Sequence, residues 1–291
     1  MKVSVIMAAF QAEATIAEAV ASAIAQTHRD WELIVVDDGS TDSTARVALA
    51  AGDPRVRVIA AEHVGVLAQV RNRGIAEARG EVLALLDADD VWAPGKLEAQ
   101  LCVLAERPEV GLVHAGADLL VEGARRPGPV SAPPAGPLLA GLLRNNYVYS
   151  SSVVVRRALL DVHGAFDPDP VLHGSPDYEL WLRLAPHTAF AYLPEPLLLY
   201  RVHAGQMSGK VRRMELGALL AIEKAQARPT AAGALRADWL LAIGRRKCAA
   251  GEPGHGVREL VGAACRRPGD LAAWRWLARA LVAQLLRRTS S

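Results

Sequence analysis

The N-terminal part of the chain alternates short apolar segments with longer amphipathic ones. Four segments are rich in Val, Ile and Leu at consecutive positions, a pattern typical of strands buried on both faces. These segments are residues 2–8, 32–37, 56–60 and 81–87. The intervening segments are rich in alanine with charges at helical spacing, and they are residues 12–27, 41–51 and 66–79. This alternation predicts an α/β fold, with a Rossmann-like, mostly parallel sheet and helices on both faces.

The rest of the chain predicts a few more strands and then helices only. Residues 123–137 contain five prolines and predict an irregular loop. Short strands are expected at residues 151–155, 190–193 and 197–202, and a helix at residues 176–184. Helices separated by Pro and Gly are expected at residues 234–250, 255–265 and 271–288. The predicted organisation is one domain of residues 1–209 and an all-helical C-terminal extension of residues 210–291.

The formal net charge of +2 conceals an asymmetry between these two parts. Residues 210–291 contain 16 Lys or Arg and 6 Asp or Glu, a net charge of +10. The preceding residues contain the other 17 basic and 25 acidic residues, a net charge of −8. An acidic body joined to a basic tail indicates two modules with different partners.

Cysteine usage and hydropathy bear on where the protein works. Cys102, Cys248 and Cys265 are far apart and form no CxxC pair, so neither a disulfide framework nor a zinc site is expected. The first apolar segment is short and leads into a helical pattern, which favours a buried strand over an export signal. No segment approaches the ~18 uninterrupted apolar residues of a membrane span. We expect a cytoplasmic protein that is soluble, or peripheral at the inner face of the membrane.

Carboxylates cluster directly after two predicted strands, where parallel sheets bind their ligands. Asp37 and Asp38 follow the second strand, and Asp87, Asp89 and Asp90 follow the fourth. Three acids within four residues repel one another, and a divalent cation with hard oxygen ligands relieves that repulsion. Mg²⁺ or Mn²⁺ that bridges the carboxylates to a diphosphate explains the cluster. The alternative is that these acids only cap the helices that follow them.

Several short motifs resemble those of family 2 glycosyltransferases. They are residues 4–11 (SVIMAAFQ), 36–40 (VDDGS), 71–74 (RNRG), 86–90 (LDADD) and 200–203 (YRVH), followed by Ser208. Their order makes the resemblance more specific than any single motif. It implies a GT-A fold, a nucleotide-diphospho-sugar donor with UDP-sugars favoured, and inversion at the anomeric carbon. It also favours a glycan or lipid-linked acceptor in bacterial surface-glycan assembly.

The resemblance implies roles in donor binding for individual residues. Asp38 would hydrogen-bond the donor base, and Ala8, Phe10 and Glu13 would shape the base pocket. Arg71 would face the nucleotide.

On the diphosphate side, Asp89 would approach the ribose and Asp90 the metal, with Asp87 in support. Which of these three acids touches the ion is left open, and Asp89 is kept as a second candidate ligand. His203 would help to hold the metal or the diphosphate. The alternative for His203 is a structural histidine.

Asp177 matches the family's catalytic base. A base must place its carboxylate within ~3 Å of the attacking hydroxyl, on the sugar face opposite the leaving diphosphate. The alternative for Asp177 is a helix N-cap. Trp181 follows one turn later on the same helix face and is a candidate for stacking on an acceptor sugar. Its alternative is a core aromatic residue.

The chain departs from the family pattern at a few positions. The family usually has Pro at the position of Ala8, Tyr at that of Phe10 and Asn at that of Gln11. Phe10 keeps the stacking face and loses the hydroxyl. Pro176 replaces the usual Glu before the catalytic Asp, which removes a second acid near the base.

The basic tail faintly resembles a tetratricopeptide-like helix pair. In its last helix, Trp274, Leu277, Leu281 and Leu285 form an apolar stripe. Such a stripe is typical of a helix docked on the core. The alternative is peripheral membrane contact of the basic helices with anionic lipid, which would bring the enzyme to a lipid-linked acceptor. No recognition motif accompanies the charge, so nucleic acid is not expected as a partner.

Two other classes of protein are less compatible with the first motif. Sugar nucleotidyltransferases carry a Gly-rich basic loop after the first strand, and dinucleotide-dependent enzymes carry GxGxxG there. Residues 8–12 contain neither glycine nor a basic residue. A nucleotide-sugar-binding scaffold protein without catalysis is the remaining alternative.

Overall fold

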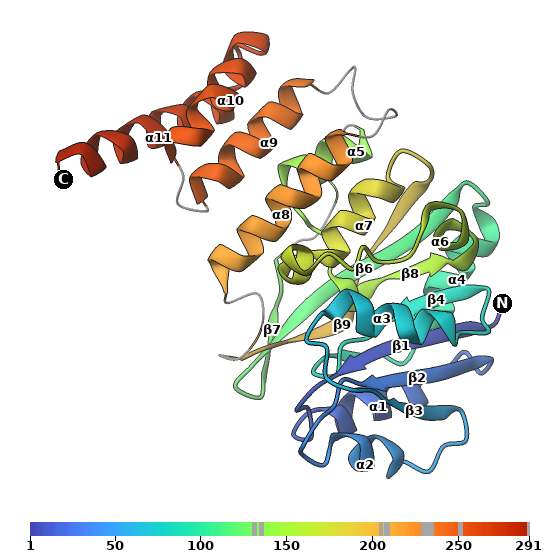
Figure 1. The fold of residues 1–291 in the computed structure, drawn as a ribbon. Coiled ribbons are helices and arrows are strands. Elements are labelled where there is room, and N and C mark those ends of the chain that lie inside the picture. Colours follow the sequence, from blue (N-terminus) through green and yellow to red (C-terminus); the bar gives the residue numbers. More distant parts are fainter. Residues whose placement is uncertain are drawn as a thin grey trace. The chain divides into compact units, whose positions relative to one another are not determined.

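The computed structural model describes residues 1–129, 133, 137–203, 206, 210–227, 236–249 and 253–289 (Figure 1). The chain forms two compact units. The first contains Met1–Pro134, Tyr147–Pro168 and His187–Ala204, and the second contains Ala135–Asn146, Asp169–Pro186 and Gly205–Ser291. The predicted boundary after residue 209 lies at the edge of a stretch outside the described residues, as does Ser208. The units differ from that division because two earlier segments group with the C-terminal helices.

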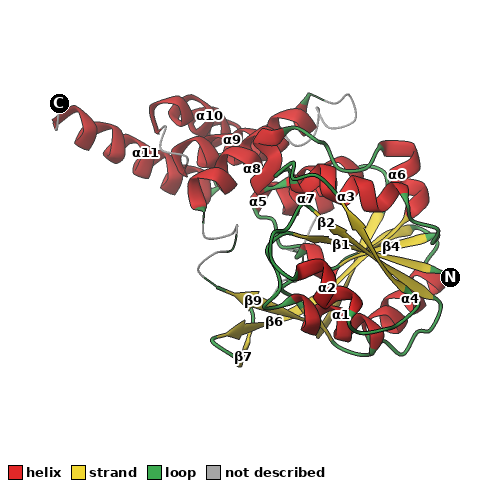
Figure 2. Cartoon of the chain, turned by 60° about the horizontal axis from the view of Figure 1, so that its bottom comes forward, coloured by secondary structure: helices red, strands yellow, loops and turns green. Residues whose placement is uncertain are grey.

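The first unit is built on one sheet, seen between its helices in Figure 2. Its strand order is β3-β2-β1-β4-β8-β6-β9-β5, and β7 pairs with β6. The strands are β1 (Val3–Ala9), β2 (Trp31–Asp37), β3 (Val56–Ala60), β4 (Val82–Leu85), β5 (Val91–Trp92), β6 (Val110–Val121), β7 (Ala124–Pro127), β8 (Val154–Arg156) and β9 (Ala189–Val202). Strand β1 pairs in parallel with β2 and β4, and β2 pairs in parallel with β3. The four predicted N-terminal strands and their parallel pairing are confirmed.

The other half of the sheet is mixed, so the prediction of a mostly parallel sheet holds for the first half alone. Strand β8 is antiparallel to β4 and β6, β5 is antiparallel to β9, and β6 is parallel to β9. The two short strands predicted between residues 190 and 202 are one strand with a bulge. A glycine is required at the bulge, since a Cβ on Gly116 would lie 2.7 Å from the Pro194 carbonyl oxygen.

The prediction of an irregular loop at residues 123–137 was wrong for the first residues of that segment. Residues Ala124–Pro127 form β7, which makes a hairpin with β6. The two turn residues, Glu122 and Gly123, both have positive φ (52° and 78°), as a tight two-residue hairpin requires. Of the rest of that segment, residues 130–132 and 134–136 lie outside the described residues. The predicted strand at residues 151–155 begins only at Val154, because Ser150–Ser152 form a 3₁₀ turn, η1.

Helices cover both faces of the sheet, as predicted. The helices of the first unit are α1 (Ile16–Ile24), α2 (Thr44–Leu49), α3 (Leu67–Ala76), α4 (Lys96–Glu106) and α6 (Arg157–His163). Helices α1 and α4 share a buried core with alternate residues of β1 and β2. Helix α3 lies on the other face, where Gly74 packs so closely that a Cβ would lie 2.8 Å from Ile6 Cγ2 (Figure 2). Burial on both faces accounts for the continuous apolar sequence of these strands.

The second unit is helical. It contains α5 (Leu138–Arg144), η2 (Pro170–Gly174), α7 (Pro176–Leu184), α8 (Val211–Gln226), α9 (Arg236–Ala249), α10 (Pro253–Arg266) and α11 (Leu271–Thr289). The predicted C-terminal helices are confirmed within the described residues. Leu260 and Leu277 belong to a core that joins α9, α10 and α11. The predicted apolar stripe of α11 is divided, since Leu277 is buried while Trp274 and Leu281 are exposed. The side chain of Leu285 lies outside the description.

Candidate functional site

The candidate site lies at the carboxyl edge of the four parallel strands. Phe10 follows β1, Asp38 follows β2, and His63 lies in the loop after β3. The acidic residues 87–90 follow β4. Strand β1 lies between β2 and β4, and Ala8 in β1 is paired with Val36 in β2, so these ends come together. The sheet therefore gathers motifs that are far apart in the sequence.

Asp38 organises the side of the site where the resemblance predicts the donor base. Its carboxylate accepts hydrogen bonds from the backbone N–H groups of Val64 (2.9 Å) and Gly65 (3.0 Å). The Nδ1 atom of His63 lies 2.9 Å from the same carboxylate. Phe10 stacks on the His63 imidazole with 4.2 Å between ring centroids, yet its side chain remains 48% exposed. Phe10 therefore presents an aromatic surface beside a buried carboxylate.

The backbone at this position depends on one glycine. Gly39 has φ +71°, and a Cβ there would lie 2.8 Å from the His63 backbone nitrogen. Glycine thus permits both the left-handed turn after Asp38 and the close approach of the loop that carries His63. Glu13 accepts a hydrogen bond from the Ser43 N–H (2.9 Å), so it joins the first loop to the start of α2.

Asp87 is held by the motif on α3. The Arg71 guanidinium is buried and its Nη2 atom lies 2.6 Å from Asp87 Oδ1. The guanidinium also lies over the Phe166 ring, 5.3 Å from its centroid. Arg71 therefore neutralises one acid of the cluster in addition to the nucleotide-facing role implied by the resemblance.

Asp89 is paired with the histidine that was predicted to belong to the site. His203 Nε2 lies 3.0 Å from Asp89 Oδ2, although the two residues are 114 positions apart. Burial and then the charge of Asp87 raise the pKa of Asp89, while the contact with His203 opposes that rise. The structure thus brings together two of the three predicted metal ligands.

Asp90 is the most deeply buried acid of the cluster, with 1% of its surface exposed. Its Oδ1 atom accepts a hydrogen bond from the Arg201 backbone N–H (3.0 Å), and its Oδ2 atom is buried without a partner among the described residues. Burial first, and then the charges of Asp89 and Asp87, raise its pKa well above the ordinary value. Burying this carboxylate is therefore only partly offset, because its Oδ1 atom has a hydrogen-bond donor and its Oδ2 atom has none among the described residues.

Arg201 is a site residue to which sequence reasoning gave no role. Its Nε atom donates to the Asp89 carbonyl oxygen (2.7 Å), and its guanidinium forms an ion pair with Glu18 on α1. Together with its backbone bond to Asp90, these contacts tie β9 to the acidic turn. The motif at residues 200–203 contains Arg201, but the resemblance gave a role only to the histidine of that motif.

The donor set at the acidic turn suits a hard divalent cation. Carboxylate oxygens with an imidazole nitrogen are ligands that Mn²⁺ and Mg²⁺ accept. The orphaned Asp90 Oδ2 is the kind of buried acceptor that a cation satisfies. Within the part of the chain that the structure describes, however, no three His, Cys, Asp or Glu side chains form a ready-made metal group.

Asp177 and Trp181 belong to the second unit, on α7. Asp177 lies in the first turn of this helix, directly after Pro176, whose fixed φ suits that position. Trp181 is fully buried, with none of its surface exposed. A ring without an exposed face is not available to stack on a sugar, so the structure favours the core-aromatic alternative for Trp181.

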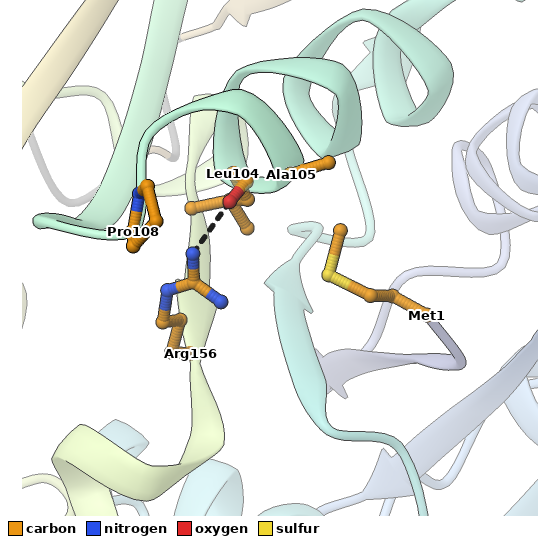
Figure 3. A pocket seen from close by; sticks show the side chains of 5 residues that line it. All are labelled: Met1, Leu104, Ala105, Pro108 and Arg156. Carbon is orange, nitrogen blue, oxygen red and sulfur yellow. Dashed lines mark hydrogen bonds between the residues drawn. The ribbon is translucent and has the colours of Figure 1, made fainter.

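A depression elsewhere on the first unit is distinct from these acids. It is lined by Met1, Leu104, Ala105, Pro108 and Arg156 (Figure 3). Arg156 Nη2 donates to the Leu104 carbonyl oxygen (2.5 Å) and its Nε to that of Val110 (2.9 Å). Arg156 is paired with Val82, the first residue of β4, so the depression lies at the opposite end of the strands from the acidic turn.

Comparison with known proteins gives a consistent result. Residues 4–126 match the family model described as glycosyl transferase family 2. The chain is 31% identical over 182 residues to the UDP-Glc:alpha-D-GlcNAc-diphosphoundecaprenol beta-1,3-glucosyltransferase WfgD of Escherichia coli. That similarity covers 62% of this chain and 69% of the relative.

Solved structures resemble the whole chain. TarS 1-349 of S. aureus in complex with UDP-GlcNAc superimposes with a TM-score of 0.69 at 17% identity, covering 99% of this chain and 92% of the other. The mannosyltransferase PcManGT of Pyrobaculum calidifontis, in complex with GDP-Man and Mn²⁺, gives 0.63 at 19% identity, covering 98% and 86%. At such identities the likeness shows the fold alone.

Proposed function

Because the chain belongs to glycosyl transferase family 2 and has the GT-A fold, we propose that it is an inverting, metal-dependent transferase that uses a nucleotide-diphospho-sugar donor. The observation that carries the proposal is the buried Asp90 carboxylate with one unpartnered oxygen at the end of β4. A buried acid among other acids is costly unless a ligand compensates it. Functional sites are where such perturbed groups gather.

The donor is a UDP-sugar in this proposal. Phe10 offers a ring face for the base, and the Asp38 carboxylate beside it retains lone pairs for a base N–H. The E. coli relative is named for UDP-Glc, and one structural neighbour was solved with UDP-GlcNAc. The other neighbour holds GDP-Man, so the base is the first property to test.

Asp89, Asp90 and His203 would hold Mn²⁺ or Mg²⁺. A divalent cation, when bound, supplies positive charge to the leaving diphosphate. Arg71 neutralises Asp87, which leaves the other two acids to balance the ion. Arg201 keeps both of them in place through its contacts with the backbone of Asp89 and the carboxylate of Asp90.

Asp177 is the proposed base. Its carboxylate takes the proton from the acceptor hydroxyl while that oxygen attacks the anomeric carbon. A single displacement on the face opposite the diphosphate inverts the anomeric centre. Two things support this role: the resemblance to the family pattern at this residue and the place of Asp177 in the first turn of α7.

The acceptor in this proposal is a glycan or lipid-linked glycan of surface-polysaccharide assembly. The E. coli relative is named for a sugar on diphosphoundecaprenol, which supports a lipid-linked acceptor. No described helix is both long and apolar enough to cross a membrane. A lipid-linked acceptor lies at a membrane, so a surface of this protein that binds membranes would bring the site to it.

Helix α11 supplies that surface in the proposal. Leu271, Trp274 and Val282 are 66%, 47% and 55% exposed, and Arg275 and Arg279 are exposed beside them. Residues 271–289 contain no Asp or Glu. Exposed apolar side chains interleaved with arginine suit the headgroup region of an anionic membrane.

Donor binding is tested by thermal shift with UDP, GDP, dTDP and CMP, each with and without Mn²⁺. A ligand that binds the native state raises the melting temperature, so a shift with UDP identifies the base. Asp38→Asn should lose that shift. Asp118→Asn is the matched control, since Asp118 is paired with Arg125 in the same unit and has no assigned role.

The outcomes separate the alternatives. A shift with another nucleotide overturns the UDP assignment and keeps the transferase. No shift with any nucleotide contradicts the donor site, and with it both the transferase and the nucleotide-sugar-binding scaffold protein. A shift without any glycosyl transfer favours the scaffold protein. Anomeric configuration of the product, determined by NMR, then tests inversion.

Membrane contact is tested by co-sedimentation of the full chain with phosphatidylcholine vesicles, with and without phosphatidylglycerol. Leu271→Glu/Val282→Glu should abolish binding to the anionic vesicles. The control is Leu49→Glu/Val162→Glu, which changes two similarly exposed side chains (52% and 75%) on the first unit. Equal binding of both double variants would remove α11 from the proposal.

A further inference from the structure

A short turn supports the acidic cluster from within the sheet. Ser151, in η1, is 1% exposed, and its hydroxyl accepts a hydrogen bond from the Asp87 backbone N–H (3.1 Å). The same side chain lowers the pKa of the Asp90 carboxylate, against the larger rise caused by burial and the neighbouring acids. One hydroxyl therefore accepts from the backbone at the start of the acidic turn and acts on the carboxylate at its end.

Ser151 is in turn held by buried polar groups. The Trp92 indole N–H donates to the Ser151 carbonyl oxygen (2.7 Å). The Gln100 amide donates to the carbonyl oxygens of Ser152 (2.7 Å) and Val113 (3.1 Å). Since a serine hydroxyl turns freely, the position of its backbone decides which acids it reaches.

A lysine without access to water completes this arrangement. Lys96 is fully buried, and its Nζ atom donates to the Gln100 side-chain oxygen (2.7 Å). It also lies 4.1 Å from the centroid of the Trp92 ring. Burial holds the pKa of Lys96 well below its usual value. Lys96 thus touches both residues that hold η1, and burying an amine is costly enough to call for a role beyond packing.

We infer that Ser151 is a positioning residue that anchors the acidic turn at the Asp87 backbone and so holds the Asp90 carboxylate in place for cation binding, and that Trp92 and Gln100 fix Ser151. The inference rests on the proposed metal-dependent function. The Asp89 and Asp90 carboxylates repel one another, so without a cation they favour a wider spacing than a cation bound by both would need. Hydrogen-bonded neighbours of metal ligands oppose such spreading, and losing one costs about 10- to 100-fold in metal affinity.

The adjacent serines provide a matched pair of variants. Ser152 is also fully buried, but its hydroxyl donates to the Tyr149 carbonyl oxygen (2.7 Å) instead of contacting the acids. Ser151→Ala and Ser152→Ala remove the same atom one residue apart. A merely structural role predicts equal effects of the two substitutions.

The test measures Mn²⁺ affinity in the presence of UDP, with free Mn²⁺ quantified by electron paramagnetic resonance. The melting temperature of each variant is measured separately in EDTA. Ser151→Ala should weaken Mn²⁺ binding about tenfold, and Ser152→Ala by less than about twofold. Both should melt at similar temperatures in EDTA, and UDP affinity without metal should not change.

Two tryptophan variants test whether the residue that holds Ser151 also affects Mn²⁺ binding. Trp92→Phe deletes the N–H that holds Ser151, while Trp31→Phe deletes an N–H that has no partner among the described residues. Both indoles are 3% exposed in the same core, so their packing losses are comparable. Only Trp92→Phe should weaken Mn²⁺ binding, by severalfold.

Two results overturn the inference and they are distinguishable. If the unmodified protein binds Mn²⁺ and the Ser151→Ala and Ser152→Ala variants bind it equally well, the positioning role of Ser151 is overturned. The proposed metal-dependent function then still stands. Absence of Mn²⁺ binding by the unmodified protein overturns the proposed metal-dependent function and the inference with it.

Discussion

Asp90→Asn is expected to make the protein more stable without metal and less stable with it. In the metal-free protein, Asp90 is 1% exposed and its Oδ2 atom has no partner among the described residues. Asparagine keeps an oxygen for the Arg201 backbone N–H and replaces the other oxygen with an amide donor. The charges of Asp89 and Asp87 act on Asp90, so a neutral amide at this position removes a like-charge repulsion.

The magnitude follows from the burial of this one atom. A buried polar group without a partner costs about 1–3 kcal/mol. The free energy of unfolding in EDTA should therefore rise by about 1–3 kcal/mol. For a chain of this size each kcal/mol moves the melting temperature by about 2–4 °C. A rise of several degrees is expected by differential scanning calorimetry.

The gain should also depend on pH. The folded-state pKa of Asp90 lies well above the ordinary value of 3.8, because of burial and then of Asp89 and Asp87. A raised pKa contributes stability that is present below the ordinary pKa and is lost as pH rises through the folded-state pKa. The unmodified protein loses this stability on going from acidic to neutral pH, whereas the Asn variant does not. The advantage of Asp90→Asn should therefore grow as the pH rises.

Saturating Mn²⁺ with UDP should reverse the order of stability. A ligand at 100 times its dissociation constant stabilises the native state by about 2.7 kcal/mol, and the variant loses this contribution with its ligand. Glu179→Gln is the control, because Glu179 is another buried acid but both of its carboxylate oxygens accept hydrogen bonds from Arg183, at 3.1 and 2.8 Å. It should destabilise the protein with and without Mn²⁺. Lower stability of Asp90→Asn in EDTA would refute the reasoning about the orphaned oxygen.

Three further predictions concern donor binding and chemistry. Phe10→Ala should weaken UDP binding by about 1–3 kcal/mol in calorimetric titration, whereas Phe10→Tyr should preserve it, because stacking needs only the ring. Asp177→Asn should lower kcat by about 10²- to 10⁴-fold while UDP affinity stays unchanged, and an unchanged kcat would remove it as the base. Arg71→Lys should weaken Mn²⁺ binding in the same resonance assay, because one ammonium replaces a guanidinium that holds Asp87 at 2.6 Å and lies over an aromatic ring. Unchanged affinity of that variant would show that neutralising Asp87 is not required.

Much of the candidate site was predictable because of a property of parallel sheets. Strands buried on both faces are continuous apolar runs, and the residues after them meet at one edge. The chain places Phe10, Asp38 and residues 87–90 after such runs, so their proximity followed from the pattern alone. The helices of the C-terminal part were also predictable, since Pro and Gly mark their ends.

The strands of the second half were harder to predict because their pairing is non-local. Strand β6 (Val110–Val121) lies beside β9 (Ala189–Val202), and neither has the alternation of a half-exposed strand. Residues 123–137 suggested a loop from their prolines, yet two turn residues with positive φ allow a hairpin before most of those prolines. Local composition does not report which distant strand offers hydrogen-bond partners.

The sequence by itself determined which residue types lie at the site and at which edge of the sheet they gather. Hydrophobic periodicity and local composition predict each strand from a few neighbouring residues, and the residues after parallel strands lie at one edge. Tertiary structure alone decided the partners. It paired Asp89 with His203 across 114 positions, placed Arg71 on Asp87, and left one oxygen of Asp90 without a partner among the described residues. It also enclosed Trp181, which sequence spacing had made a candidate for sugar contact. Burial and charge pairing depend on what the rest of the chain brings into contact, and that is a property of the packed fold.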